Sequence, residues 1–307
     1  MKETTYAVGT IGLCGESVFL TVPHFHMPGE TLRAGSLFTE PGGKAYNQAV
    51  AAQRLGGSAF FLGAVGTDPS AEHCRNFLAD EGVSPLLQYV EGERTAYACI
   101  LTDARGENQV TVFRGASERL TPDFIREHES DIARCSCLLL TLECPLEAVW
   151  AAAEIALRHR VFTILNPAPA VPLPADRLKQ LDLITPNRQE AMTLLGLAGD
   201  PSPAKLAKAI CAAGIQKAVV TLGSEGALLV ENAKACLFPA KKVNAVDTTG
   251  AGDTFNAALA VAISRGEPLA RAVEYATIAS AWSVQKAHVM DSLPTQRDMQ
   301  NENFMGV

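Results

Sequence analysis

Short apolar runs alternate with longer segments of helical periodicity through the second half of the chain. The runs predict strands at residues 138–142, 162–165, 183–185, 218–222 and 227–230, and the longer segments predict helices at 145–158, 189–195, 203–213, 252–264 and 269–283. Strand–helix alternation of this kind is typical of a mostly parallel sheet with helices on both faces. The predicted fold class is therefore α/β.

The first half mixes this pattern with a second set of strands. Buried strands are predicted at 6–11 and 59–65, helices at 42–57 and 69–81, and further short strands at 17–22, 32–39, 97–102 and 109–114. The last two read as a hairpin, and we expect these four short strands to build a small sheet of their own. We therefore expect one domain over residues 1–307, with a β appendage at roughly 15–40 and 95–115.

Composition narrows the classes of protein that remain. The 307 residues are 48% hydrophobic and 19% charged, with a net charge of −7, which suits an ordinary globular protein and argues against a nucleic-acid partner. We expect no signal peptide, because the N-terminal residues carry an acid and lead straight into a strand-like run, and no apolar stretch approaches membrane-spanning length. Eight scattered cysteines read as reduced thiols, so we expect a cytoplasmic protein; Cys135 and Cys137 have no partner pair at zinc-ligand spacing.

Polar residues or glycines follow several of the predicted strands. Glu143, Asn166, Asn187 and Gly223 come just after four different strands. Ligands of open parallel sheets bind beyond the carboxyl ends of the strands. We therefore expect these positions to border a site for sugars or phosphates.

The stretch at 246–255 predicts a tight turn that opens a helix. Gly250 and Gly252 flank Ala251, and Asp253 follows. Backbone N–H groups and the helix dipole at such a turn attract an anion, and a carboxylate beside them suits phosphoryl transfer to a hydroxyl. A structural alternative is that Asp253 is only a first-turn acid. The spacing fits neither the dinucleotide-binding nor the P-loop fingerprint.

This stretch and a distant one together resemble the ribokinase family, the carbohydrate kinases also called the PfkB family. The second stretch is 41–49, which reads PGGKAYNQA. Further matching blocks follow in the same order over nearly the whole chain, at 28–31, 142–147, 166–170, 185–190 and 221–226. The resemblance implies an α/β fold with a β lid, and an ATP- and Mg²⁺-dependent kinase.

The resemblance assigns roles on the phosphate side of the site. Asp253 is the implied general base, and the amides of Gly250, Ala251 and Gly252 are the implied anion hole. Nucleotide binding is carried over to Asn187, Thr221, Gly223, Ser224, Gly226 and Gly252, and contact with Mg²⁺ through water to Glu190. Asn187 is also a good helix N-cap, which is the structural alternative for it.

The sugar and cation sides follow from the same resemblance. Gly42, Gly43, Lys44, Asn47 and Glu143, together with the base Asp253, are the implied contacts of the sugar. For Lys44 alone the alternative is a solvated lysine at a helix start. Asp247, the carbonyl of Thr249 and Ser292 are the implied ligands of a monovalent cation such as K⁺. The lid is expected to cover the sugar and to pair with its twin in a homodimer.

Three departures from the family pattern bear on the acceptor and the cation. The family's Asn-x-Asp after the first strand is replaced by residues 12–16, GLCGE, where Glu16 is expected to stand in for the aspartate. Tyr46 is expected to put a phenol near the sugar pocket. Residues 286–291 stand where a small glycine is usual, and His288 within them is expected to be a surface loop residue.

The sequence thus predicts ATP-dependent phosphorylation of the terminal hydroxymethyl of a small sugar, with ribose as the first candidate. A ketohexose, a nucleoside or a glycated amine stays open as the acceptor. A sugar-sensing protein that has lost catalysis is a further alternative, although a retired enzyme has no need of both the base and the anion hole.

Overall fold

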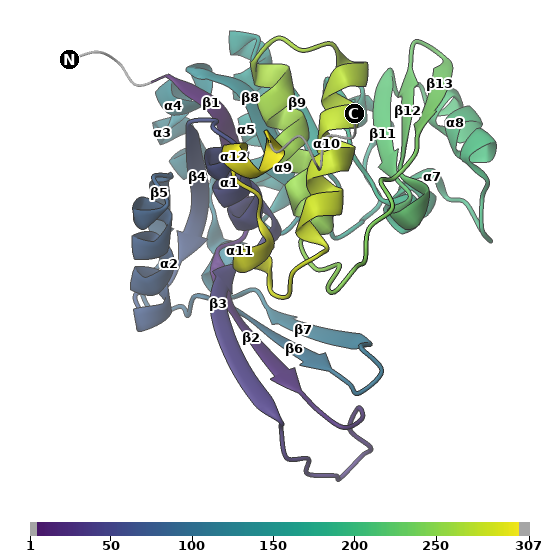
Figure 1. Cartoon of the computed structure of the whole chain (residues 1–307). Helices are drawn as coiled ribbons and strands as arrows, with labels where there is room; N and C mark the ends of the chain where they lie inside the picture. The colour runs from purple at the N-terminus through teal and green to yellow at the C-terminus, as the bar shows by residue number, and fades with distance from the viewer. Residues whose placement is uncertain (1–4, 301–307) are drawn as a thin grey trace.

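Two sheets organise the chain in this computed structural model, which describes residues 5–300. The main sheet has nine strands in the order β13-β12-β11-β10-β9-β8-β1-β4-β5 (Figure 1). They are β1 Tyr6–Ile11, β4 Ala59–Val65, β5 Ser84–Tyr89, β8 Cys135–Thr141, β9 Phe162–Asn166, β10 Leu183–Ile184, β11 Lys217–Thr221, β12 Ala227–Glu231 and β13 Lys234–Phe238. The strands from β5 to β11 are parallel, and β12 and β13 pair antiparallel at one edge.

Helices cover both faces of this sheet. The helices are α1 Lys44–Arg54, α2 Pro69–Asp80, α3 Pro122–Glu127, α4 Glu129–Ala133, α5 Leu146–His159, α6 Ala175–Leu178, α7 Arg188–Leu195, α8 Pro203–Ala212, α9 Ala251–Ser264, α10 Leu269–Ser283, α11 Val289–Ser292 and α12 Gln296–Met299. One apolar core joins a sheet face to α1, α2, α9 and α10, and a second core joins the other face to α3, α4, α5 and α8. Central strands such as β4 are buried along their whole length because both faces are covered.

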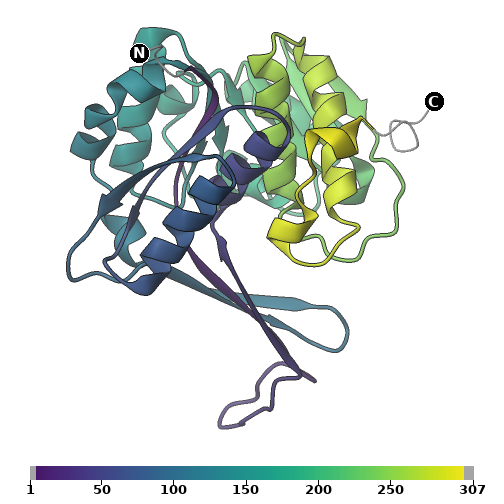
Figure 2. The same cartoon turned by 60° about the vertical axis from the view of Figure 1, so that its left-hand side comes forward.

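The small sheet projects from one end of the main body (Figures 1 and 2). Its order is β3-β2-β6-β7, from Gly15–Thr21 (β2), Ser36–Gly42 (β3), Ala96–Thr102 (β6) and Asn108–Phe113 (β7). We call this sheet the lid. β3 runs straight into Gly43 and α1, so the lid is joined to the main body at the carboxyl edge of the main sheet.

The α/β architecture and the separate small sheet confirm the predicted fold class. The prediction from sequence missed β5, β13 and the short helices α3, α4, α6, α11 and α12. These elements are short or largely exposed, so their apolar spacing is weak. In the described residues no helix is long and apolar enough to cross a membrane, and no cluster of metal-ligating side chains includes Cys135 and Cys137.

Candidate active site

The turn before α9 lies at the carboxyl edge of the sheet, as the sequence predicts. Gly250 is the N-cap of α9 with φ 78°, and a Cβ there would lie 2.7 Å from Cγ1 of Val289. Only glycine combines this left-handed conformation with such a close neighbour. Gly252, two residues further on, has open space where a Cβ would lie.

Asp253 lies in the first turn of α9 and is 8% exposed. Its Oδ2 accepts a hydrogen bond from Nδ2 of Asn47 at 2.8 Å, and its Oδ1 accepts one from Nε2 of Gln48 at 3.2 Å. Burial raises the pKa of Asp253, while the Lys44 ammonium and the two amide donors oppose that rise. The carboxylate is therefore oriented by helix α1 and is a stronger base than a solvated aspartate.

A polar cavity of about 190 Å³ opens beside this carboxylate. Its walls come from the ends of β9, β10 and β11 and from the heads of α1, α7 and α9. It is lined by Lys44, Asn166, Ala168, Thr185, Asn187, Glu190, Thr221, Gly250, Gly252, Asp253 and Asn256. Strand ends that are far apart in sequence thus meet at one place, as expected for a parallel sheet.

Lys44 is the cation of this cavity. Burial works against the charge of its ammonium, but three neighbouring carboxylates outweigh burial and raise its pKa above the usual value. They belong to Asp253, Glu143 and Glu190. The side chain is half-buried among these acids, so the alternative of a solvated lysine is wrong.

Glu143 binds the start of α1 from the end of β8. Its Oε2 accepts a hydrogen bond from the backbone N–H of Lys44 at 2.7 Å. Burial raises the pKa of Glu143 to about 7, against the lowering effect of the Lys44 charge. This carboxyl therefore changes its charge near neutral pH.

Asn187 and Glu190 form a capping box at the start of α7. The Asn187 side chain accepts from the Glu190 N–H, and the Glu190 carboxylate accepts from the Asn187 N–H, each at 2.8 Å. The N-cap alternative for Asn187 is confirmed, and both residues also line the cavity. Burial raises the pKa of Glu190, although the Asn187 amide and Lys44 oppose it.

Other predicted residues lie at varying distances from this cavity. Thr221 lines it, whereas Gly223, Ser224 and Gly226 form the turn after β11. Ala251 is not part of the lining, and its N–H donates a hydrogen bond to the carbonyl oxygen of Thr248, with an N···O distance of 3.3 Å.

The residues predicted to bind a monovalent cation lie next to the turn at Gly250–Gly252. The Asp247 carboxylate accepts hydrogen bonds from the N–H groups of Thr249 at 2.9 Å and of His288 at 3.3 Å. Ser292 is buried, and its hydroxyl donates to the carbonyl of Val289 at 2.8 Å. Both segments therefore meet at the head of α9.

Two side chains that were predicted near the sugar, those of Tyr46 and Glu16, point to α2 in the structure. Tyr46 does not put a phenol near the sugar: its ring is fully buried and its hydroxyl donates to the carbonyl of Cys74 in α2 at 2.8 Å, so this expectation is wrong. Glu16 is not among the residues that line the cavity, and its carboxylate lies 3.2 Å from Nδ1 of His73 on α2.

His288 is also more than the surface loop residue that we expected. It is half-buried, and its ring stacks on Phe38 with centroids 3.9 Å apart. The sequence around His288 does not predict this contact, because Phe38 is 250 positions away in the chain.

Sequence reasoning did not assign roles to Gln48 and Asn256. Nε2 of Gln48 also donates to Oδ1 of Asn166 at 3.1 Å, and Nδ2 of Asn256 donates to the Gly252 carbonyl at 2.9 Å. Both are polar residues on helices whose other buried residues are mostly alanine and other apolar types, which is the signal that marks them. They orient the Asp253 carboxylate and the turn at Gly250–Gly252.

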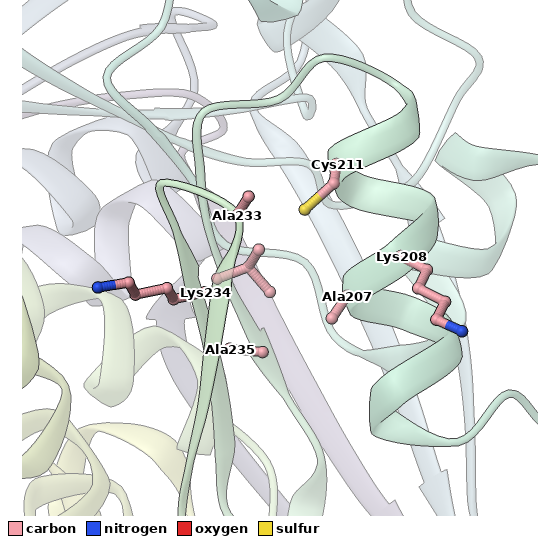
Figure 3. A pocket seen from close by; sticks show the side chains of 7 residues that line it. Ala207, Lys208, Cys211, Ala233, Lys234 and Ala235 are labelled. Carbon is pink, nitrogen blue, oxygen red and sulfur yellow. The ribbon is translucent and has the colours of Figure 1, made fainter.

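A second groove lies elsewhere and lacks these features. It has a volume of about 300 Å³ and runs between α8 and the β12–β13 hairpin (Figure 3). Ala207, Ala233, Ala235 and Cys211 line it, while the ammonium groups of Lys208 and Lys234 point away from each other. Nothing in it brings polar groups together as the cavity at α9 does.

A carboxylate base beside a glycine turn, at the carboxyl edge of a parallel sheet, is the arrangement of a phosphotransferase that acts on a hydroxyl. The sequence profile of the pfkB family of carbohydrate kinases matches residues 9–296. The ribokinase of Haemophilus influenzae is 36% identical over 301 residues, covering 97% of both chains. This chain therefore belongs to the pfkB carbohydrate kinase family, and it is an ATP-dependent carbohydrate kinase.

Solved structures agree with this assignment. The crystal structure of ribokinase from Thermotoga maritima has a TM-score of 0.87 and 31% identity, covering 98% of this chain and 99% of its own. Arabidopsis thaliana ribokinase, solved in complex with ribose and ATP, has a TM-score of 0.89. At 24% identity, over 99% of this chain and 100% of the other, it supports the shared fold.

Proposed function

We propose that this enzyme transfers the terminal phosphoryl group of ATP to the hydroxymethyl group of ribose, giving ribose 5-phosphate and ADP. The observation that carries the proposal is the buried Asp253 carboxylate, which shares one cavity with Gly250 and Gly252. The similar proteins from H. influenzae and T. maritima are both ribokinases, which favours ribose over other acceptors.

Asp253 acts as the general base in this proposal. It takes the proton of the sugar hydroxyl while that oxygen attacks phosphorus, and the bond to the ADP oxygen breaks. The N–H groups at Gly250 and Gly252 stabilise the charge on the transferred group together with the positive end of α9. The N–H of Ala251, which donates to Thr248 here, joins them in this proposal by turning toward the phosphoryl group. Because Asn47 and Gln48 hold the carboxylate in place, little reorientation is needed at the moment of transfer.

The remaining sugar contacts come from the start of α1 and the end of β8. Gly42, Gly43, Lys44, Asn47 and Glu143 supply them in this proposal. Among residues 5–300, Oδ1 of Asn47 finds no hydrogen-bond partner although it is buried, whereas Nδ2 is bonded to Asp253. A buried acceptor of this kind is satisfied by a hydroxyl donor, which a sugar provides. Glu16, whose carboxylate lies 3.2 Å from Nδ1 of His73, is a further candidate contact of the sugar in this proposal.

ATP lies along α7 and the turn after β11 in this proposal. Asn187, Thr221, Gly223, Ser224 and Gly226 flank it, and Gly252 contacts its terminal phosphate. Glu190 fits a divalent ion: only its Oε2 accepts from the Asn187 amide, and the carboxylate faces the cavity. Mg²⁺ bound there through water would neutralise charge on the phosphates.

A monovalent cation such as K⁺ fits beside the anion turn. Asp247, the carbonyl of Thr249 and Ser292 would hold it. Two backbone amides orient the Asp247 carboxylate, and the Ser292 hydroxyl, which donates to Val289, keeps its lone pairs for a cation. The ion would offset the negative charge of Asp247 close to the phosphate site.

The proposal extends to the whole molecule. The chain over residues 1–307 works as one kinase domain in which the lid, residues 15–40 and 95–115, covers the sugar and joins a second copy in a homodimer. Leu37, Tyr97 and Phe113 are 68%, 44% and 54% exposed on the lid, which supports an apolar partner surface. Eight free thiols favour a reducing compartment such as the cytoplasm.

A panel of acceptors tests the proposal. Ribose, 2-deoxyribose, fructose, adenosine and a glycated amine are each offered with ATP and Mg²⁺, and ADP release is followed with mass analysis of the product. Ribose is expected to give the highest kcat/KM, with one phosphate added. A clear preference for another acceptor would refute ribose, and ADP release with none of them would refute the kinase proposal.

A further inference from the structure

The lid meets the C-terminal loop at a junction built from one acid and three rings. We define the junction as Glu40 on β3, Phe19 on β2, Phe38 on β3 and His288, which precedes α11. Successive residues of a strand point to opposite faces of a sheet, whereas residues paired across two strands share a face. Phe19 pairs with Phe38, and Glu40 is two residues further along β3, so all three lie on the same face. That face of the lid therefore meets the loop.

Glu40 binds the loop with both carboxylate oxygens. Oε1 accepts from the N–H of Val289 at 2.9 Å, and Oε2 accepts from the N–H of Met290 at 3.0 Å. The side chain is only 4% exposed, so both bonds lie away from solvent. Removing the carboxylate leaves two buried N–H donors without partners, which is costly.

His288 joins the same loop to the lid through its ring. The imidazole stacks on Phe38 with centroids 3.9 Å apart and an interplanar angle of 27°, and meets the edge of Phe19 at 5.7 Å. Its backbone has φ 65° and ψ 153°, a conformation that residues other than glycine rarely adopt. The surrounding contacts hold this strained conformation in place.

The loop continues from the junction to the phosphate side of the site. The N–H of His288 donates to Asp247, three residues before Gly250. The side chain of Val289, whose amide binds Glu40, lies beside Gly250, where its Cγ1 would be 2.7 Å from an added Cβ. Val289 therefore links the lid directly to the turn that we assign to the anion hole, because its amide binds Glu40 and its side chain lies beside Gly250.

We propose that Glu40 and His288 are positioning residues, through which the lid strand that leads into the sugar site sets the geometry of the Asp247–Gly252 turn. Neither residue is among those that line the cavity at α9. The inference deepens the proposed function and depends on it, because it takes that turn to be the anion hole. Lid contact and anion-hole geometry are then coupled.

A set of variants separates this role from a merely structural one. His288→Gly removes the ring but relieves the backbone strain, so the fold is expected to be as stable as the wild type or more so. Its kcat for ribose phosphorylation is expected to fall about 5- to 30-fold, within the range of coupling between packed elements. His288→Phe keeps a stacking ring and is expected to recover most of kcat. Equal kcat in the wild type and His288→Gly would overturn the inference.

A double-mutant cycle tests the coupling directly. Phe38→Ala and His288→Gly share one contact, so their effects on kcat are expected to be clearly less than additive in logarithm. Glu40→Gln, which loses one of two acceptors, is expected to lower kcat without raising KM for ATP. Glu30→Gln is the matched control, because Glu30 also accepts a backbone N–H in the lid region, from Met27, but lies away from the junction. Full additivity, or an equal loss in Glu30→Gln, contradicts the proposal.

Hydrogen exchange gives a readout that does not need activity. Amides of residues 247–252 are expected to exchange faster in Glu40→Gln and His288→Gly than in the wild type, and unchanged in Glu30→Gln. If the wild type phosphorylates no sugar while this exchange difference is present, the proposed function fails and the junction stands as a mechanical link. If the wild type is active and exchange is the same in all variants, the junction proposal fails by itself.

Discussion

At the scale of single residues, the site depends on carboxylates that burial has made more basic. Asp253, Glu143 and Glu190 all have raised pKa values because they are removed from water, and Lys44 partly offsets the effect in each. Lys44 offsets part of the negative charge of these three carboxylates only while its ammonium stays protonated. Changing one member therefore alters the others as well as its own contact.

Asp253→Asn tests the general base. The amide has nearly the same shape but accepts no proton, so kcat is expected to fall about 10²- to 10⁴-fold. Nucleotide affinity is expected to change little, because Asp253 lies on the acceptor side of the transferred group. Single-turnover phosphate transfer and calorimetric ATP binding measure the two effects. Asp123→Asn, an exposed change on α3, is the control; near-normal turnover in Asp253→Asn would refute the base assignment.

Glu143 predicts a pH dependence of stability. Burial raises its pKa to about 7 in the folded protein, above the value of an ordinary glutamate. Between those two pH values the folded chain holds a proton that the unfolded chain has released. Stability is therefore expected to fall as the pH rises from the ordinary glutamate range to about 7.

Urea unfolding from pH 5 to pH 8 measures this trend. Glu143→Gln carries no proton and is expected to lose less stability than the wild type as the pH rises. Glu147→Gln, an exposed change at the start of α5, is expected to keep the wild-type trend. The same slope in Glu143→Gln as in the wild type would contradict the raised pKa.

At the scale of elements, the head of α9 is fixed by the α11 loop. Gly250 has a left-handed backbone and lies against Val289, whereas Gly266 after the end of the same helix has φ 80° and open space around it. Both glycines therefore have a positive φ, but only Gly250 has a side chain, that of Val289, close to the place of a Cβ. That difference makes them a matched pair.

Both Gly250→Ala and Gly266→Ala are expected to cost about 1–2 kcal/mol in unfolding free energy, because alanine is strained at positive φ. Gly250→Ala is expected to cost about 1–3 kcal/mol more through the clash with Val289, and also to lower kcat. Chemical unfolding and steady-state kinetics measure these losses. Equal stability and equal kcat in the two variants would show that the Val289 contact does not matter.

Short elements show where prediction from sequence stops. The spacing of apolar residues predicted β1, β4, α2 and α10 closely, because strands buried on both faces and long amphipathic helices leave clear patterns. It missed β5, in which five of the six residues are half-buried, and the exposed β13. Edge strands are recognised by their neighbours and not by their own composition.

At the scale of the whole molecule, the lid gives the chain two apolar faces. The strand register places Leu37 on the same face of the lid as its neighbours Leu20 and Leu101. Phe38 and Val110 lie on the opposite face. Leu37 and Val110 are 68% and 58% exposed. The first of these faces lies opposite the junction with His288.

Leu37→Asp is expected to weaken the proposed homodimer, because a carboxylate on the partner face is left without water or a counter-charge. Val110→Asp, of similar exposure on the opposite face, is the control and is expected to leave assembly unchanged. Sedimentation velocity over a range of concentrations measures both. A wild type that is monomeric throughout, or a control that dissociates equally, would contradict a dimer through this face.

The sequence by itself determined the class of fold, the meeting of the strand ends, and the presence of Asp253, Gly250 and Gly252 in one cavity there. Alternating periodicity reports burial on each face of a strand or helix, and the glycines around Asp253 report a turn that few other residues allow. Periodicity and turn preference depend on residues that are neighbours in the chain, so the sequence is enough to predict them.

Only the tertiary structure decided which way side chains point and what they meet. It turned Tyr46 into α2, directed Glu16 to His73, brought Gln48 to Asp253 and placed His288 between the lid and the anion turn. Each of these contacts except the one at Glu16 joins positions more than a hundred residues apart or lies inside a packed core. Their geometry follows from the packing of all elements together, because a side chain adopts the direction in which its polar atoms find partners.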